Sequence, residues 1–208
     1  INVTVPFKNK IIPYLDQLSP EAEKTKSVNT IYTSNEQIIG HNTDIAGFEL
    51  SLKKLKYDVS GKKILILGAG GVVPSLIFAL FKMKAAKITL SNRSRNNAEI
   101  LKKLFNELTI VDWGTLIDFD MIINATSVGL KKNDIINLDL SEIGRDKFFY
   151  DVIYNPKETD FLRKGKKSKN KTQNGEKMFI YQALASFKIW HGVEPTVDDK
   201  VLKIFNND

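Results

Sequence analysis

The spacing of apolar residues along the chain changes near residue 57. Beyond it, short and nearly continuous apolar runs such as Ile64–Leu67 alternate with longer stretches in which apolar residues recur every three or four positions. Buried strands that alternate with amphipathic helices are typical of a parallel sheet covered by helices on both faces. The pattern therefore predicts an α/β fold for this part of the chain.

The expected elements of this part follow from the same pattern. We predict strands at Lys63–Leu67, Lys87–Ser91, Leu108–Val111, Met121–Asn124 and Phe148–Asp151. We predict helices at Val72–Met83, Arg95–Leu104, Asp160–Lys167, Lys177–Trp190 and Thr196–Phe205.

Residues 1–56 combine short strands with helices. Polar and β-branched residues alternate over Asn2–Val5 and stop at Pro6, which predicts a strand that presents Lys8 just beyond its end. Taken alone, this segment also fits an edge strand followed by an ordinary surface lysine. The other elements expected here are a helix from Ser19 to Thr25, strands at Val28–Thr33 and Gln37–Gly40, and an amphipathic helix at Ile45–Leu55 capped by Asn42 or Thr43.

A glycine-rich turn follows the apolar run Ile64–Leu67. The segment Gly68–Gly71 leads directly into an apolar helical stretch. In dinucleotide-binding folds, such glycines let the backbone turn tightly and approach a pyrophosphate, whose charge meets the amides at the helix N-terminus. Val73 occupies the place of the third glycine of the common motif, so an ordinary strand-to-helix turn is the alternative. The surrounding pattern favours a dinucleotide site in a Rossmann-type domain.

The end of the next expected strand indicates which dinucleotide is bound. The segment Asn92–Arg95 contains no carboxylate, whereas NAD-binding folds usually place Asp or Glu there to bind the ribose 2′-hydroxyl. Arginine can instead pair with the 2′-phosphate of NADP and stack on adenine. We therefore expect NADP as the cofactor, bound by Arg93 and Ser94 with added charge from Arg95. Arginines that only cap a helix are the alternative.

Composition excludes several classes of protein. The 208 residues are 42% hydrophobic and 26% charged, as in ordinary globular proteins, and no apolar stretch approaches the length of a membrane span. With no cysteine and only His41 and His191, neither a disulfide framework nor a metal site is expected. We expect a cytoplasmic protein that does not contact a membrane.

The net charge of +7 comes mostly from lysine, and part of it is concentrated in residues 163–171. Such a cluster can indicate nucleic-acid binding. No aromatic residue is interleaved to stack on bases, however, so we interpret the cluster as a solvated helix end and loop. A mild positive field suits an anionic small-molecule substrate and cofactor, and no nucleic-acid partner is expected.

Several segments resemble, in the same order, the motifs of the shikimate dehydrogenase family. They are Asn2–Lys8, Val28–Thr30, Asn42–Asp44, Gly68–Gly71, Asn124–Ser127 and Gly175–Gln182, so that the resemblance runs from Ile1 to about residue 195. It implies reversible, NADP-dependent reduction of 3-dehydroshikimate to shikimate, in chorismate and aromatic amino acid biosynthesis. It also implies that Lys8 is the catalytic acid and base and that Asp44 is its partner.

The resemblance assigns further residues to the ligands. For the substrate they are Asn2, Thr4, Asn29, Tyr154 and Gln182. For the cofactor they are Gly68, Ala69, Gly70, Gly71, Val72, Asn92, Arg93, Ser94, Arg95, Ala125, Thr126, Ser127, Val152 and Gly175. Asn and Gln at such positions also occur as structural caps. Asn97 stands where the family pattern has a second arginine.

The resemblance further implies two domains separated by a cleft. Residues 1–56 would form a small α/β substrate-binding and catalytic domain, and residues 57–190 the Rossmann-type NADP-binding domain. The chain begins inside the first motif, without the family's Ser-x-Ser pair for the substrate carboxylate, so we expect an N-terminally truncated sequence. We expect a C-terminal helix at 191–208 to complete the small domain, and a homodimer is considered. The rival interpretations are an NAD-preferring quinate/shikimate dehydrogenase and a catalytically silent nucleotide-binding module.

Overall fold

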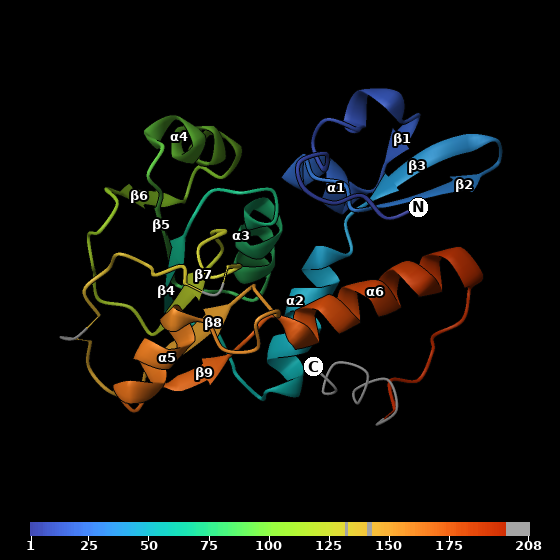
Figure 1. Ribbon diagram of the computed structural model, residues 1–208. Coiled ribbons are helices and arrows are strands. Elements are labelled where there is room, and N and C mark those ends of the chain that lie inside the picture. The colour runs from blue at the N-terminus through green and yellow to red at the C-terminus, as the bar shows by residue number, and fades with distance from the viewer. Residues whose placement is uncertain (132, 141–142, 199–208) are drawn as a thin grey trace.

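The computed structural model describes residues 1–131, 133–140 and 143–198. It contains a large sheet and a small sheet, and helices α2 (Asp44–Lys54) and α6 (Glu176–His191) cross between them (Figure 1). No helix in the described ranges is both long and apolar enough to cross a membrane.

The large sheet has the strand order of a Rossmann fold. Its strands are β4 (Lys63–Leu67), β5 (Lys87–Ser91), β6 (Thr109–Val111), β7 (Met121–Asn124), β8 (Phe148–Asp151) and β9 (Lys171–Gln173). They lie in the order β6-β5-β4-β7-β8-β9 and all pairs are parallel. The sequence order reverses between β4 and β7, where such sheets bind dinucleotides at the carboxyl ends of their strands.

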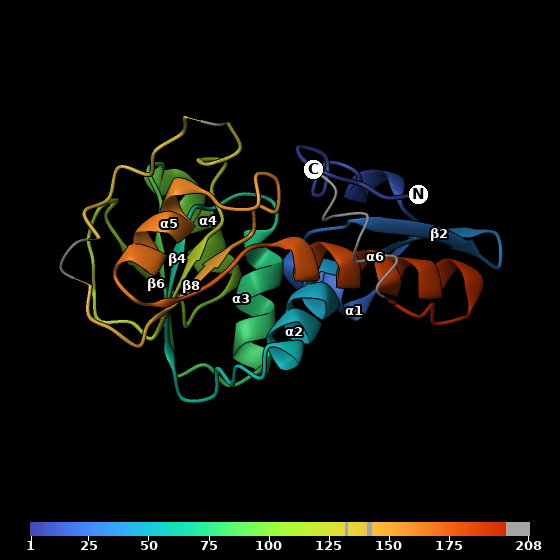
Figure 2. The same ribbon diagram turned by 60° about the horizontal axis from the view of Figure 1, so that its bottom comes forward.

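Both faces of this sheet are buried. Along β4, Ile64 and Ile66 pack with helices α2, α3 (Val73–Lys82) and α4 (Arg95–Leu104), whereas Leu65 and Leu67 pack with α5 (Asp160–Lys167) on the other face. Figure 2 shows α2 and α3 side by side. Burial on both faces explains why the strands read as continuous apolar runs.

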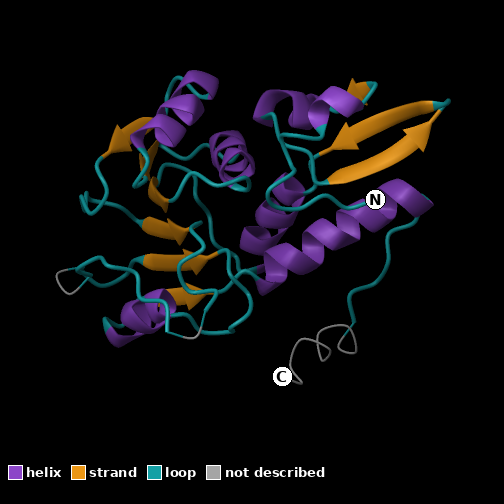
Figure 3. Ribbon diagram, turned by 45° about the horizontal axis from the view of Figure 1, so that its top comes forward, coloured by secondary structure: helices purple, strands orange, loops and turns teal. Residues whose placement is uncertain are grey.

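The small sheet consists of β1 (Gln17–Leu18), β3 (Gln37–His41) and β2 (Thr30–Ser34), in that order. β2 and β3 form an antiparallel hairpin, and β1 pairs with β3 in parallel. The short helix α1 (Pro20–Thr25) begins at Ser19, whose hydroxyl accepts a hydrogen bond from the Ala22 amide. The sheet lies against α6, as Figure 3 shows.

A single glycine sets the distance between α2 and α6. A Cβ on Gly47 would lie 2.7 Å from the Met178 carbonyl oxygen and 2.8 Å from Gln182 Cβ. The two helices can therefore cross this closely only because residue 47 has no side chain. The crossing brings Gln182 beside the first turn of α2, which begins with Asp44.

The predicted N-terminal strand is wrong. Asn2–Val5 makes only an isolated bridge, between Asn2 and Thr30, and then turns, with the Phe7 amide bonded to the Thr4 carbonyl oxygen. Val5 is 67% exposed, so this residue is not paired into a buried strand. The turn, rather than a strand, delivers Lys8.

The other expected elements agree with the structure to within about two residues. The sequence pattern missed β1 and β9, which have two and three residues and no alternation of apolar positions. The helix expected at Thr196–Phe205 falls mostly on residues 199–208, which lie outside the described ranges, and residues 196–198 are not helical. Of the C-terminal helix expected at 191–208, His191 is instead the last residue of α6 and residues 192–198 are not helical. The rest of that expected helix lies outside the described ranges.

Candidate active site

A buried ion pair joins the N-terminal turn to the start of α2. Lys8 Nζ donates a hydrogen bond to Asp44 Oδ2 at 2.5 Å, and the two side chains are 11% and 7% exposed. Asp44 is the first residue of α2, where the helix dipole favours a carboxylate. The pair expected from the sequence is thus assembled, with an amine held in a fixed place by its carboxylate.

Asn29 extends this pair towards α6. Its carboxamide nitrogen lies 3.0 Å from Asp44 Oδ1 and 3.2 Å from Gln182 Oε1. Asp44 therefore has a donor on each carboxylate oxygen, Lys8 on one and Asn29 on the other. Asn2 joins the same network, because its carboxamide nitrogen contacts the Asn29 carbonyl oxygen and the Ser186 hydroxyl.

Two of the expected substrate residues stand outside this network. Thr4 is exposed, and its backbone carbonyl accepts the bond that closes the N-terminal turn. Tyr154 is 38% exposed and its ring stacks on Phe179, with ring centroids 4.4 Å apart. In the described part of the chain neither side chain is hydrogen-bonded to the Lys8–Asp44 pair.

Several buried polar residues of the site were missed from the sequence. Thr30, Thr43 and Ser186 are at most 1% exposed and bring their hydroxyls together beside Asn29. Asn42, expected as a helix cap and as part of the Asn42–Asp44 motif, accepts a hydrogen bond from the Asp44 amide and also bonds to Ser75 on α3. Thr30 and Thr43 lie in the motifs at residues 28–30 and 42–44, and Ser186 lies one helical turn after Gln182 on the same face.

The glycine-rich turn has the backbone that a pyrophosphate requires. Gly68 has φ +102°, and a Cβ there would lie 2.8 Å from the Ala125 carbonyl oxygen, so only glycine fits. Among the described residues no protein acceptor meets the amides of residues 69–72, just before α3. Free amides at a helix N-terminus are a ready anion site, so the turn fits the diphosphate of a dinucleotide.

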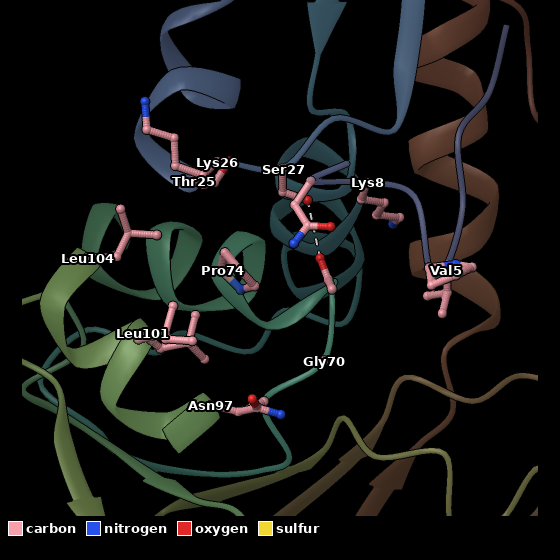
Figure 4. Close-up of a pocket in the computed structure, with 15 residues that line it drawn as sticks. Val5, Lys8, Thr25, Lys26, Ser27, Gly70, Pro74, Asn97, Leu101 and Leu104 are labelled. Carbon is pink, nitrogen blue, oxygen red and sulfur yellow. Dashed lines mark hydrogen bonds between the residues drawn. The ribbon is translucent and has the colours of Figure 1, made fainter. Parts of the chain in front are cut away.

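This turn and Lys8 line one cavity of about 370 Å³. Figure 4 shows Lys8 and Ser27 on one side and Gly70, Pro74 and Asn97 on the other. The Ser27 hydroxyl donates to the Gly71 carbonyl oxygen at 3.2 Å, and a Cβ on Gly71 would lie 3.9 Å from Lys8 Cδ. The Lys8 side chain is therefore adjacent to the glycine turn.

The two arginines after β5 differ in what they contact. Arg95 forms ion pairs with Glu99 at 2.8 Å and with Asp112 at 3.4 Å. Arg93 is exposed and has no ion pair with any residue that the structure describes. Asn92 turns its amide to the Ser94 carbonyl oxygen. Arg93 is thus the guanidinium available to a 2′-phosphate, and Arg95 is already engaged.

The remaining expected cofactor residues gather at the carboxyl ends of β7 and β8. Ala125–Ser127 follows β7 and Val152 follows β8, and the Val152 amide bonds to the Asn124 carbonyl oxygen. Gly175, just before α6, packs so closely on Val152 that a Cβ would lie 2.1 Å from its carbonyl oxygen. These residues form one edge of the sheet, facing the same cleft as the glycine turn.

A buried carboxylate holds this edge together. Asp151 accepts hydrogen bonds from Asn124 Nδ2, the Ile153 amide and the Thr159 hydroxyl, the last at 2.6 Å. Burial raises the pKa of Asp151 to about 6, although these donors oppose the shift. Asn124 in turn accepts from Thr126, so that Asp151 fixes the loop after β7.

The arrangement suits proton transfer coupled to hydride transfer. A lysine amine held by a carboxylate can exchange a proton with a substrate hydroxyl or carbonyl oxygen. The neighbouring turn has the free amides and the glycines for a dinucleotide, which is the group that carries hydrides. The polar wall of Asn2, Asn29 and Gln182 offers directional donors and acceptors to a hydroxylated molecule.

Three family models match consecutive parts of the chain. The shikimate dehydrogenase substrate binding domain matches residues 1–31, the shikimate / quinate 5-dehydrogenase model residues 49–157, and the shikimate 5′-dehydrogenase C-terminal domain residues 175–199. The second model alone covers more than half of the chain.

Individual proteins agree with these models. A shikimate dehydrogenase (NADP(+)) of Pelagibacter ubique (strain HTCC1062) is 57% identical over 206 residues, which are 99% of this chain and 78% of that protein. The crystal structure of shikimate dehydrogenase from Aquifex aeolicus matches with a TM-score of 0.90 and 40% identity, over 100% of this chain and 77% of that one. The Thermus thermophilus enzyme in complex with NADP(H) and shikimate matches with a TM-score of 0.88 and 30% identity, over 98% of this chain and 76% of that one.

Proposed function

The chain belongs to the shikimate dehydrogenase family, and on that premise we propose that it is an NADP-dependent shikimate dehydrogenase (shikimate 5-dehydrogenase). It interconverts shikimate and 3-dehydroshikimate, the step that serves chorismate and aromatic amino acid biosynthesis. The observation that carries the proposal is that Lys8, which is paired with Asp44, lines the same cavity as the glycine turn at Gly70 and Gly71. Acid–base group and cofactor turn are therefore within reach of one small substrate.

Lys8 performs the proton transfer in this proposal. In the direction of alcohol oxidation, the unprotonated amine takes the proton of the reacting hydroxyl while the carbon loses its hydrogen as hydride, and the C–O bond becomes a carbonyl. In the reverse direction the ammonium returns that proton to the oxygen. Asp44 holds the amine through the 2.5 Å bond and so keeps it aimed at the cleft.

NADP supplies the hydride acceptor or donor when it is bound. The chain's own part is to hold the group: the amides of residues 69–72 bind the diphosphate, and Arg93 binds the 2′-phosphate. Residues Ala125–Ser127, Val152 and Gly175 line the edge of the sheet where the rest of the cofactor would lie. Asn92 and Ser94 shape the turn that carries Arg93.

The substrate is held by the polar wall that surrounds the catalytic pair. Asn29 and Asp44 bind ring hydroxyls, and Gln182 reaches a hydroxyl from α6. Thr4 and Tyr154, which stand apart from the network, are proposed to meet the carboxylate end. Residues 1–56 form the substrate domain and residues 57–190 the NADP-binding domain in this proposal, with α2 and α6 connecting them.

Use of NAD is a second candidate, because one observation favours it. Arg95 is bound to Glu99 and Asp112, and Asn97 stands where the family pattern has a second arginine, so Arg93 is left as the single guanidinium for a 2′-phosphate. A single cation discriminates between NADP and NAD less strongly than two. A relative of this fold from Listeria monocytogenes was crystallised in complex with shikimate and NAD.

The test is an initial-rate assay of the purified chain with shikimate and quinate, each with NADP and with NAD. The proposal predicts the highest kcat/KM for shikimate with NADP. A higher kcat/KM with quinate and NAD would assign the chain to the NAD-preferring alternative. Absence of turnover with all four combinations, in a folded preparation that still binds NADP, would leave a nucleotide-binding module.

A further inference from the structure

Ser186 lies at the centre of a buried cluster of hydroxyls behind the catalytic pair. Its Oγ is 2.7 Å from the Thr30 hydroxyl and 3.0 Å from the Thr43 hydroxyl, and these two are 3.2 Å from each other. Ser186 and Thr30 are completely buried and Thr43 is 1% exposed. None of the three side chains reaches the cleft, so the cluster does not act on substrate directly.

The cluster fixes the orientation of the Asn29 carboxamide. Asn29 Oδ1 accepts from the Thr43 amide at 2.7 Å and from the Thr30 hydroxyl at 3.1 Å. The amide nitrogen contacts the Thr43 hydroxyl at 2.9 Å and faces Asp44 Oδ1 and Gln182 Oε1. The position of Asn29, and through it the second oxygen of Asp44, depends on where the two threonine hydroxyls point.

Ser186 determines that direction. Its single proton is shared between the Gln182 carbonyl oxygen one turn earlier and the Thr30 hydroxyl, whose own proton goes to Asn29, and its lone pairs accept from Thr43 and from Asn2. Removing Ser186 would take from Thr30 its shortest contact, at 2.7 Å, and from Thr43 a contact at 3.0 Å. The two threonine hydroxyls would then turn towards Asn29 or towards each other, because a buried hydroxyl without a partner is costly.

The Ser186–Thr30 contact is one of a series of hydrogen bonds that aligns α6 with β2 and the residue before it. Gln182, Ser186 and Trp190 lie at intervals of four on one face of α6, and they bond to Asn29, Thr30 and the Ile31 carbonyl oxygen. Successive helical turns thus contact successive residues. Ser186 is the middle contact, between the substrate-facing Gln182 and the structural Trp190.

We propose that Ser186 is a positioning residue for the reaction: through Thr30 and Thr43 it orients Asn29 and thereby the Lys8–Asp44 pair. The proposal rests on the function proposed above. It predicts that loss of the Ser186 hydroxyl slows turnover per folded molecule while leaving cofactor binding unchanged, because the cluster is on the substrate side of the cleft. Small misplacements of catalytic groups have large effects on rate.

The experiment compares Ser186→Ala with a matched control, Ser51→Ala. Ser51 is also a completely buried helical serine with two hydrogen bonds, to Tyr150 and to the Phe48 carbonyl oxygen, but it has no contact with the hydroxyl cluster. We expect Ser186→Ala to lower kcat with shikimate by about tenfold or more, with an NADP Kd within twofold of the wild type. We expect Ser51→Ala to lower the melting temperature without a comparable loss of kcat.

A second pair of variants covers the case in which Ser186→Ala does not fold. Thr30→Val keeps the shape of a β-branched strand residue and removes its hydroxyl, and Thr30→Ser keeps the hydroxyl. The proposal predicts that Thr30→Val loses kcat as Ser186→Ala does and that Thr30→Ser retains most of it. Wild-type kcat in Ser186→Ala or in Thr30→Val, or an equal loss in Ser51→Ala, would overturn the positioning role.

Failure of the proposed function would be distinguishable from failure of this inference. If the wild type does not turn over shikimate with either cofactor, the function fails and the variants are not compared. If the wild type is active and the hydroxyl variants are equally active, the function stands and the role of Ser186 is refuted.

Discussion

At the scale of single residues, the charged side chains of the site differ in whether they already form ion pairs. Lys8 and Asp44 satisfy each other, Arg95 is engaged by two carboxylates, and Arg93 has no ion pair within the described chain. On the proposed function, this free guanidinium binds the 2′-phosphate that NADP has and NAD lacks.

Arg93→Ala should weaken NADP binding far more than NAD binding, because only NADP carries the 2′-phosphate. The expected loss for NADP is about 1.5–3 kcal/mol, the range for a hydrogen bond to a charged group. Arg95→Ala is the matched control and should have a smaller effect, since its guanidinium is held by Glu99 and Asp112. Fluorescence titration of each variant with both cofactors measures this. Equal weakening of both cofactors by Arg93→Ala would mean that this residue stacks on adenine and does not bind the phosphate.

Asp151 should make stability depend on pH. Burial raises its pKa from 3.8 in the unfolded chain to about 6. The native state therefore binds the proton more tightly, and the contribution of Asp151 to the free energy of unfolding falls as pH rises from about 4 to about 6 and is constant above that. Relative to Asp151→Asn, the wild type should lose roughly 2 kcal/mol between pH 4 and pH 7. Urea unfolding at both pH values measures the difference, and a difference that does not change with pH would show that Asp151 titrates normally.

At the scale of elements, the site depends on how closely α2 and α6 cross. Gly47 permits the approach that brings Gln182 beside Asp44 and Asn29. α6 is then held along β2 by Gln182, Ser186 and Trp190. The two helices together position the catalytic site, because α2 carries Asp44 and α6 carries Gln182, which bonds to Asn29.

Gly47→Ala should therefore destabilise the protein, although alanine favours helices by about 1 kcal/mol over glycine. Its Cβ would lie 2.7 Å from the Met178 carbonyl oxygen, a backbone atom that can move only with the helix. We expect a net loss of about 1–3 kcal/mol, the usual cost of overpacking, together with lower turnover as Gln182 is displaced. Gly144→Ala is the control, because in the described part of the chain no atom beyond its two sequence neighbours lies within 4 Å of the added Cβ. A Gly47→Ala variant as stable as the wild type would show that the crossing can relax.

How far the sequence predicts these elements depends on their apolar pattern. The buried strands of the large sheet and its helices were predictable because burial on both faces leaves continuous apolar runs and regular spacing. β1 and β9 were not, because such short strands with polar residues resemble loops. The N-terminal strand was wrong because alternation over Asn2–Val5 does not guarantee an extended ladder, and here the pairing stops at one bridge to Thr30 and the Val3 amide bond to the Asn29 carbonyl oxygen.

The features of the catalytic site likewise divide into those that the sequence predicts and those that it does not. Lys8, Asp44, Asn29 and Gln182 could be named in advance from motifs that resemble a family. The contact of Thr30 and Thr43, which lie in such motifs, with Ser186 could not, because Ser186 is distant in sequence and only the packing of α6 along β2 brings the three hydroxyls together. Arg95 was expected to add charge at the phosphate, but its ion pairs with Glu99 and Asp112 depend on distances that no motif contains.

At the scale of the whole molecule, the cavity that holds Lys8 and the glycine turn lies between the N-terminal turn and α1 on the small-sheet side and α3 and α4 on the large-sheet side. The chain crosses between the two sides along α2, whose Phe48 and Ser51 contact Tyr150 of β8, and again along α6, which is hydrogen-bonded to residues 29–31. Ser27–Gly71 and Asn42–Ser75 bonds already join the two sides.

Binding of both ligands should close this cleft. Diphosphate and ring hydroxyls contact opposite sides, and a site between two bodies excludes water only when they approach. The radius of gyration from small-angle scattering should therefore fall when shikimate and NADP are both present, and each ligand alone should shift it in the same direction. An unchanged interdomain angle in crystal structures with and without both ligands would indicate a rigid, preformed site.

The most direct measurement of the central claim is the turnover of Lys8→Met on shikimate with saturating NADP. Loss of a general acid–base group should lower kcat by about 100-fold or more. The NADP Kd should stay within twofold, and Lys10→Met, which removes an exposed lysine two residues away, should retain wild-type kcat. Circular dichroism confirms that the variants compared are folded. A folded Lys8→Met variant with wild-type kcat would contradict the account, because the proton would then be transferred by another group.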